Sequence, residues 1–285
     1  MPTALLTGST GFTGCVMAEA LAARGINVVP LDCDITDKEA VRVVVARAAP
    51  DWVIHLAALS FVGDADLEAF YRVNVFGTLH VLEAIDALKK PPTRVLIASS
   101  ANIYGSPAID LINEHVMPAP VNHYACSKLV MEHMVNPWFE RLPMVITRPF
   151  NYTGVGQDER FLIPKIVGHF ARQAPVIELG NLDISRDFSD VREVVSAYLA
   201  LLESNVSGMK VNVCSGRATS LRAIIAQMND LAGYTIDVRV NPAFVRANDI
   251  PVLRGDNHLL RELIGQVPSI PLLQTLTDMF TARCP

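Results

Sequence analysis

The feature that most limits how this chain can fold is a glycine-rich turn between a short apolar strand and a helical pattern. The apolar segment 4–6 runs into Gly8, Thr10, Gly11, Phe12, Thr13 and Gly14, and a helix is predicted over 15–24. Glycines let a backbone turn tightly and approach a pyrophosphate, which the N-terminus of the next helix attracts. The spacing, Gly-x-x-Gly-x-x-Gly, can also form a turn that binds nothing. Its place between strand and helix favours a dinucleotide site.

The rest of the first half repeats the strand–helix alternation. Further apolar strands are predicted over 28–31, 53–56, 95–98 and 144–147, and helices over 37–48, 66–88 and 122–141. Strands that alternate with helices predict right-handed crossovers and an α/β fold with a doubly wound parallel sheet, the Rossmann fold.

The pattern changes after Asn151, where glycines and prolines divide the chain into shorter elements. We expect residues 1–150 to form the dinucleotide-binding domain and residues 151–285 to form mainly a smaller α/β substrate-binding domain. A strand within 187–215, with its apolar part at 211–214, is expected to return to the main sheet.

Composition excludes several classes of protein. The 285 residues are 51% hydrophobic, and the net charge of −5 argues against a nucleic-acid partner. No apolar run approaches the roughly 18 residues of a membrane span, and the first residues do not resemble a secretory signal. Five cysteines without Cys-x-x-Cys spacing suggest reduced thiols in the cytoplasm, and the histidines show no metal-site spacing, so no metal is expected.

Candidate catalytic residues lie downstream of the glycine turn. Tyr124 and Lys128 are one helical turn apart, and Ser100 follows the strand predicted over 95–98. A phenol titrates near pH 10, and a nearby ammonium can stabilise the phenolate and bring its pKa into a working range. With the Ser100 hydroxyl polarising a carbonyl, the three could transfer a proton while a nicotinamide transfers a hydride. A Tyr-x-x-x-Lys pair alone is weak, since surface helices contain it by chance.

Several motifs follow one another along the chain. They are Thr7-Gly8-x-x-Gly11-Phe12-x-Gly14, His55-Leu56-Ala57-Ala58, Asn74-Val75-x-Gly77-Thr78, Ser99-Ser100-x-x-x-Tyr104-Gly105, Tyr124-x-x-x-Lys128, Arg148-Pro149-Phe150-Asn151 and Arg186-Asp187-Phe188-Ser189-Asp190-Val191. With these motifs in this order, the chain resembles the extended short-chain dehydrogenase/reductase family over nearly its whole length. Within that family it is most similar to the GDP-mannose 4,6-dehydratase branch, and in particular to the branch's reductases of GDP-4-keto-6-deoxy-mannose.

The resemblance implies the catalytic roles. Tyr124 would give its proton to the developing alkoxide, Ser100 would bind the same oxygen, and Lys128 would hold the nicotinamide ribose. Dehydratases of the branch have a glutamate two positions after the catalytic hydroxyl. Asn102 stands there, and an amide cannot act as a carboxylate base. The resemblance therefore favours a reductase over a 4,6-dehydratase.

The resemblance also implies how NAD(H) or NADP(H) would be bound. Asp32 lies 18 positions after Gly14, where an acidic residue holds the adenosine ribose and repels a 2′-phosphate, which favours NAD(H). Asp32 could instead begin a turn, and use of both cofactors stays open. The remaining cofactor residues implied are Asp34 and Ile35 at the adenine, Leu56, Ala57, Ala58, Asn74, Ala98 and Pro149, together with Tyr124 and Lys128.

The substrate implied is a nucleotide-diphosphate sugar, with a GDP-sugar favoured. Asn151 and Lys165 would contact its phosphates, and Ser100 and Asn102 would also contact the substrate. Arg186 and Arg246 would clamp the diphosphate. Asp249 is a candidate for the nucleotide ribose, although it replaces the glutamate of the branch pattern.

Several alternatives stay open from sequence. The expected product is GDP-D-rhamnose, with the 6-deoxy-talose epimer as a variant, and neither the base nor the C4 configuration is determined. A nucleotide-sugar 4-epimerase or dehydratase is the rival enzyme, and an NAD(P)-responsive binding protein is the rival of another class. Relatives pair the helices corresponding to 66–88 and 122–141 into a four-helix bundle, so a homodimer is expected, although core packing explains the same apolar residues. A cytoplasmic location is expected.

Overall fold

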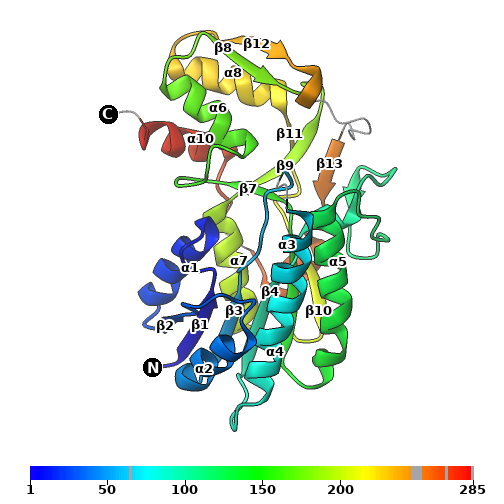
Figure 1. Ribbon diagram of the computed structural model, residues 1–285. Coiled ribbons are helices and arrows are strands. Elements are labelled where there is room, and N and C mark those ends of the chain that lie inside the picture. Colours follow the sequence, from blue (N-terminus) through cyan, green and yellow to red (C-terminus); the bar gives the residue numbers. More distant parts are fainter. Residues whose placement is uncertain (64–65, 245–251, 267–268, 284–285) are drawn as a thin grey trace.

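A parallel sheet of six strands forms the larger part of the protein in this computed structural model, which describes residues 1–63, 66–244, 252–266 and 269–283 (Figure 1). The strand order is β10-β6-β4-β3-β1-β2, and every neighbouring pair is parallel. The strands are β1 (Thr3–Thr7), β2 (Asn27–Pro30), β3 (Trp52–His55), β4 (Arg94–Ala98), β6 (Met144–Pro149) and β10 (Met209–Val213).

Helices cover both faces of this sheet, which confirms the predicted doubly wound Rossmann fold. The helices α1 (Phe12–Ala23), α7 (Val191–Glu203) and α9 (His258–Ile264) pack on one face. On the other face lie α2 (Lys38–Ala48), α4 (Thr78–Asp86) and α5 (His123–Val135). Strand residues such as Leu5, Leu6 and Ile54 are fully buried, as the continuous apolar runs of the sequence require.

Two of the predicted helices are interrupted. The segment predicted as 66–88 divides into α3 (Leu67–Tyr71), a π-helical turn over Arg72–Gly77 and α4. Asn74 lies in this turn, and its side chain contacts Leu59 and Ser127 instead of solvent. The segment predicted as 122–141 ends as α5 at Val135, and a 3-10 turn over Asn136–Glu140 follows, because proline near its start cannot continue an α-helix.

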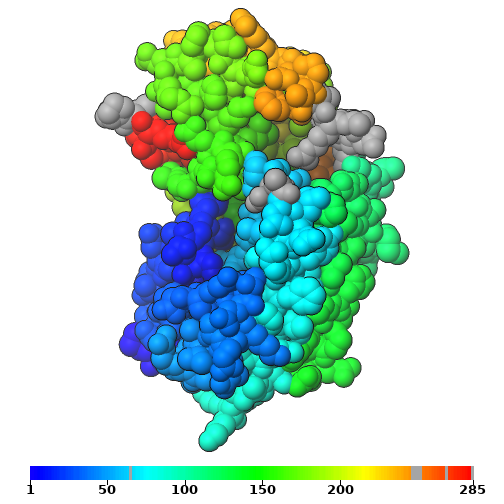
Figure 2. Space-filling model, viewed as in Figure 1, coloured from blue at the N-terminus to red at the C-terminus, as the bar shows by residue number. Residues whose placement is uncertain are grey.

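The smaller part of the protein lies above the carboxyl ends of the main strands in Figure 1. Its helices share a separate apolar core. The smaller part consists of the helices α6 (Leu162–Ala171), α8 (Leu221–Ala232) and α10 (Leu272–Thr281), the parallel strands β8 (Val176–Leu179) and β12 (Asp237–Val240), and the short 3-10 turn Pro242–Phe244. Figure 2 shows the surface hollowed between the dark blue N-terminal segment and the cyan segment, beneath this smaller part.

A second sheet connects the two parts. Its order is β11-β9-β13-β5, and β7 also pairs with β9. The strands are β5 (Leu111–Ile112), β7 (Asn151–Thr153), β9 (Ser185–Asp190), β11 (Ala218–Ser220) and β13 (Val252–Gly255). After β9 the chain returns through α7 to β10, which pairs with β6 at the edge of the main sheet. The division into two domains at residue 150 stays a prediction, since α7 and β10, which follow residue 150, belong to the main sheet and its helices.

Candidate active site

Tyr124, Lys128 and Ser100 meet where α5 crosses the end of β4. Helix α5 begins after Asn122, whose Oδ1 accepts a hydrogen bond from the Ala125 amide at 2.8 Å. Tyr124 and Lys128 therefore share one helix face, and both side chains are buried. The Ser100 side chain acts on the Tyr124 phenol and lowers its pKa. The Lys128 ammonium donates to the carbonyl oxygen of Ala98 at 2.8 Å.

The protonation of this trio differs from the sequence-based expectation. Burial raises the pKa of Tyr124 to about 12, and the Ser100 side chain offsets only part of that rise. Burial also lowers the pKa of Lys128 to about 8. The expectation that Lys128 brings the phenol into a working range does not hold in this structure, because burial raises the pKa of Tyr124 above its usual value. At neutral pH Tyr124 carries its proton and Lys128 is mainly charged, which suits a group that donates a proton.

The glycine turn leaves backbone close to backbone. Gly8 has a φ of +69°, and a Cβ atom there would lie 2.8 Å from the Ala57 nitrogen. A Cβ atom on Gly14 would lie 2.0 Å from the Gly8 carbonyl oxygen. Gly11 caps α1 without a side-chain hydrogen bond, the first turn has no acidic residue, and Thr10 and Gly11 are exposed. These uncapped amides fit the pyrophosphate of a dinucleotide.

A buried chain of hydrogen bonds positions the small residues that follow β3. The Thr7 hydroxyl accepts from the amides of Leu56 and Ala57 at 3.1 and 3.0 Å. The same hydroxyl lies 2.8 Å from His55 Nδ1, and His55 Nε2 lies 2.9 Å from the Thr78 hydroxyl. Burial lowers the pKa of His55 to about 3, so the ring is neutral. His55 is thus a packed strand end that fixes the turn 56–58.

On the adenosine side, Asp32 follows β2 and its side chain is 63% exposed, with a carboxylate oxygen 3.7 Å from Arg47 Nη2. The Asp34 carboxylate accepts from the amide and hydroxyl of Thr36 at 2.8 Å each. Ile35 is buried against Gly77, where a Cβ atom would lie 2.8 Å from Ile35 Cγ2. The cofactor contacts of Asp32, Asp34 and Ile35 stay predictions.

Sequence reasoning missed Tyr152, which connects the second sheet to the glycine turn. Its hydroxyl lies 2.9 Å from the Thr13 hydroxyl, and its ring stacks on Phe12 with 6.1 Å between centroids. The two bonded residues are 139 positions apart, so no local pattern points to the contact. Nearby, Pro149 ends β6 and is buried.

The structure brings some of the predicted substrate residues together. Asn151 and Arg186 lie on the neighbouring strands β7 and β9, and Asn151 Nδ2 donates to the Asp187 carbonyl oxygen at 3.3 Å. Asn102 is exposed beside Ser100. Lys165 contacts other groups, since its ammonium donates to the Glu178 carbonyl at 2.9 Å and lies over the Phe244 ring. Their substrate roles stay predictions.

Arg246 and Asp249 lie outside the described residues. The positions of these two candidates for the diphosphate and the nucleotide ribose therefore form no part of the site described above.

Asp187, next to Arg186, holds three segments together. Its buried carboxylate accepts from the Ser215 amide and hydroxyl at 3.0 and 2.6 Å, from the Gly216 amide at 2.9 Å and from the Gly255 amide at 3.2 Å. These bonds fix β9 against the loop after β10 and the end of β13.

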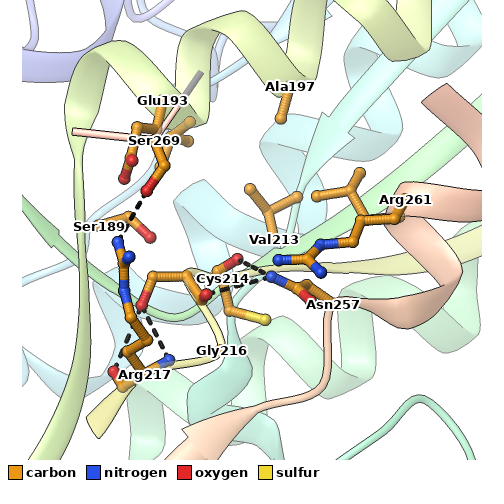
Figure 3. Close-up of a pocket in the computed structure, with 13 residues that line it drawn as sticks. Ser189, Glu193, Ala197, Val213, Cys214, Gly216, Arg217, Asn257, Arg261 and Ser269 are labelled. Atoms are coloured by element: carbon orange, nitrogen blue, oxygen red, sulfur yellow. Dashed lines mark hydrogen bonds between the residues drawn. The ribbon is translucent and has the colours of Figure 1, made fainter. Parts of the chain in front are cut away.

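Behind that loop lies a cavity of about 320 Å³, bounded by α7, α9 and the end of β10 (Figure 3). Arg217 crosses it to the Ser269 hydroxyl at 2.8 Å, and Asn257 donates to the Ser215 carbonyl oxygen at 3.2 Å. Ser100, Tyr124 and Lys128 are not among the residues that line this cavity. It is separate from the catalytic trio.

Other expectations concern absences. Among the described residues, no group of His, Cys, Asp and Glu side chains could hold a metal ion. No described helix is long and apolar enough to cross a membrane. Cys15, Cys33, Cys126 and Cys214 are free thiols.

Comparison with known proteins first defines the class. The sequence and the fold match NAD(P)-dependent oxidoreductases that act on nucleotide sugars, and this chain is such an enzyme. The profile of the GDP-mannose 4,6 dehydratase family matches residues 30–279. The chain belongs to that family, within the short-chain dehydrogenase/reductase enzymes that the sequence motifs indicate.

Two relatives are similar over most of their length. GDP-6-deoxy-D-talose 4-dehydrogenase of Aggregatibacter actinomycetemcomitans is 36% identical over 266 residues, which cover 92% of this chain and 90% of the relative. GDP-6-deoxy-D-mannose reductase of Pseudomonas aeruginosa is 34% identical over 286 residues, which cover 95% of this chain and 93% of the relative.

Two solved structures are also similar. A protein of Burkholderia cenocepacia J2315, described as a candidate epimerase, is 46% identical with a TM-score of 0.93, over 99% of this chain and 98% of that one. The RMD protein of Pseudomonas aeruginosa, solved with NADPH, is 31% identical with a TM-score of 0.91, over 99% of both chains.

Proposed function

We propose that this protein reduces a nucleotide-linked 4-keto-6-deoxy-hexose with NADH or NADPH, and that the substrate is GDP-4-keto-6-deoxy-D-mannose with GDP-D-rhamnose as the product. The observation that carries the proposal is the buried Ser100–Tyr124 pair, with a protonated phenol beside a hydroxyl. The names of the two GDP-sugar relatives support the substrate class.

The residues of the trio divide the chemistry between them. When bound, a reduced nicotinamide supplies the hydride that the carbonyl carbon accepts. Tyr124 donates its proton to the carbonyl oxygen, and its pKa of about 12 keeps that proton available at neutral pH. Ser100 donates a hydrogen bond where negative charge develops on the oxygen. Lys128 keeps a positive charge near the phenolate that results and would hold the nicotinamide ribose.

The cofactor would lie on the glycine turn, between α1 and the segment 56–58. Asp32 favours NAD(H), because its carboxylate repels a 2′-phosphate. Arg47, 3.7 Å from Asp32, offers a positive partner for such a phosphate. The NADPH bound by the Pseudomonas aeruginosa RMD protein supports NADP(H). Dissociation constants for NADH and NADPH, measured with native protein and Arg47→Leu, test which nucleotide is preferred; loss of NADPH affinity alone is expected.

The decisive assay incubates the protein with GDP-4-keto-6-deoxy-D-mannose and follows nicotinamide absorbance, with the C4 configuration of the product read by NMR. Stoichiometric cofactor oxidation and a D-rhamnose product are expected. A 6-deoxy-talose product would support the proposed reductase activity and change only the proposed C4 configuration of the product. Turnover without net oxidation would refute the reductase and favour a 4-epimerase, for which the description of the Burkholderia cenocepacia protein is the supporting observation.

The same assay addresses the remaining alternatives. A 4,6-dehydratase would convert GDP-mannose itself, and exposed Asn102 in place of a carboxylate disfavours that reaction. A protein that only binds NAD(P) would bind the cofactor and turn over no nucleotide sugar. Thermal shifts with GDP, UDP and dTDP test the base, and a shift with GDP alone is expected.

A homodimer through α4 and α5 is part of the proposal. Phe76 and Val130 are 54% and 45% exposed, which leaves apolar surface on the π-helical turn and on α5. Light scattering of native protein and Phe76→Lys tests the assembly, and a dimer that the variant converts to a monomer is expected. A cytoplasmic location stays a prediction based on the number and spacing of the cysteines in the sequence.

A further inference from the structure

Glu132 is a fully buried carboxylate that the proposed reaction does not use. It lies on α5, one helical turn after Lys128 and two after Tyr124, on the same face of the helix. Its Oε1 accepts a hydrogen bond from the Ser99 hydroxyl at 2.6 Å. A charge this deeply buried is costly unless it is paired, so its presence next to the catalytic residues needs an explanation.

Three contacts join this helix face to three consecutive residues at the end of β4. The Lys128 ammonium donates to the Ala98 carbonyl oxygen, Glu132 accepts from the Ser99 hydroxyl, and the Ser100 side chain acts on the Tyr124 phenol. The side chains at positions i, i+4 and i+8 of α5 therefore fix the register between the helix and the strand end. The Glu132 contact holds Ser99, the residue that precedes Ser100.

Positive groups surround the Glu132 carboxylate. Arg148 of β6 donates to it twice, at 2.9 and 2.7 Å, and is almost fully buried. Lys210 of β10 lies 3.3 Å away and is 24% exposed. Burial by itself would raise the pKa of Glu132, but the hydrogen bonds and charge of Arg148 lower it overall, so the group is ionised.

Lys128 receives the field of this carboxylate. Burial lowers the pKa of Lys128, and Glu132 acts in the opposite direction. His55 of β3 also interacts with Lys128, but it is neutral. The titratable and charged groups that face the pair are His55, Tyr124, Arg148 and Lys210, with Tyr104 and Glu114 beyond Arg148.

We propose that Glu132 is a positioning residue for the catalytic trio, which fixes Ser99 and α5 in register and places a negative charge one helical turn from the Lys128 ammonium. The inference rests on the proposed function, because the charge on Lys128 matters for a proton donated by Tyr124. It assigns to the buried Glu132–Arg148 ion pair a role in the chemistry in addition to packing.

The test measures the Lys128 charge directly and needs no substrate. The chain has six lysines, so their ¹³Cε NMR signals can be followed from neutral pH to about pH 11, around the usual lysine pKa. The Lys128 signal is assigned with Lys128→Arg. In Glu132→Gln the Lys128 midpoint is expected to fall by about one pH unit or more, the scale of one opposite charge at this range. In Glu203→Gln, which alters an exposed carboxylate on α7, it is expected to stay unchanged.

Lys210→Met provides an independent test if Glu132→Gln does not fold. Removal of this partly exposed charge leaves the Glu132 carboxylate less neutralised, so the Lys128 midpoint is expected to rise. If the Glu132 charge did not act on Lys128, neither Glu132→Gln nor Lys210→Met would shift the Lys128 midpoint through it. An unchanged Lys128 midpoint in folded Glu132→Gln, or an unchanged or lowered one in Lys210→Met, would overturn the proposal.

The reaction provides a second readout. The alkaline limb of the kcat/KM profile is expected to shift in the same direction as the Lys128 midpoint in each variant. If the midpoints shift as expected but no ketone reduction is seen, the proposed function fails while the charge relation between Glu132 and Lys128 stands.

Discussion

Gly14→Ala is the sharpest test of the glycine turn. The new Cβ atom would lie 2.0 Å from the Gly8 carbonyl oxygen and 2.8 Å from Ser9 Cα, whereas ordinary contacts begin near 3.4 Å. The difference from 2.0 Å, 1.4 Å, must be absorbed by backbone, because both neighbours are main-chain atoms. Overpacking of this kind costs about 1–3 kcal/mol, and more where backbone must move. The higher helix propensity of alanine relative to glycine offsets about 1 kcal/mol of this loss of stability.

We therefore expect Gly14→Ala to lower the free energy of unfolding by about 2 kcal/mol, which corresponds to a decrease in Tm of about 4–8 °C for a chain of this size. The displaced turn should also lose at least one charge-assisted hydrogen bond to the cofactor phosphates, which weakens NADH or NADPH binding about tenfold or more. Thermal unfolding and fluorescence titration with the reduced cofactor measure the two effects.

Gly168→Ala is the matched control, since it is also a glycine-to-alanine change inside a helix. Its Cβ atom would meet Glu159 Oε1 at 2.7 Å and Arg283 Nη1 at 2.8 Å, and both atoms end flexible side chains that can move. Its stability should stay within about 1 kcal/mol of the native protein, with cofactor affinity unchanged. Native Tm and native cofactor affinity in Gly14→Ala would refute the assignment of this turn.

Three further predictions follow from the site. Tyr124→Phe should fold but lose about 10²–10⁴-fold in kcat. The control Tyr234→Phe removes only a hydrogen bond to a main-chain oxygen in the smaller part and should keep the native kcat. Equal kcat values in the two variants would contradict the role of the Tyr124 phenol. Since burial lowers the pKa of His55 from 6.5 to about 3, the unfolded chain takes up a proton that the folded protein refuses. Stability should fall as pH drops from about 6.5 toward 3, and urea unfolding of His55→Gln should show a shallower dependence; an equal slope would count against a neutral, buried ring. Arg186→Leu should abolish the thermal shift with GDP, while Arg222→Leu, which breaks only an exposed ion pair, should retain it; retention in both would exclude Arg186 from the diphosphate site.

Local patterns in the sequence predicted the parts of the site that depend on local geometry. The glycine turn between β1 and α1 was predictable because three glycines within seven residues form it. Tyr124 and Lys128 were predictable because one helix turn places them together. The same helix spacing also placed Glu132 one turn after Lys128, a signal that could have been followed.

The remaining contacts depend on segments distant in the chain. A buried charge on Glu132 is understandable only because Arg148 of β6 and Lys210 of β10 lie beside it. No local sequence pattern predicts that these two strands bring positive charges to α5. Tyr152 meets Thr13 across 139 positions. Asn74, in the π-helical turn, donates to the Ser127 hydroxyl 53 positions away. The direction of the Tyr124 pKa shift could not be predicted, because burial, which sequence does not show, raises the pKa more than Ser100 lowers it.

The return of the chain through α7 to β10 limits how this protein can be divided. More than half of the buried residues on one face of the main sheet come from segment 191–213. A fragment that stops after β6 would expose that apolar face and leave β6 as an unpaired edge, a combination that promotes aggregation. An exchange of sugar specificity with another enzyme must therefore keep 191–213 with the cofactor half, and graft only the elements on either side of it.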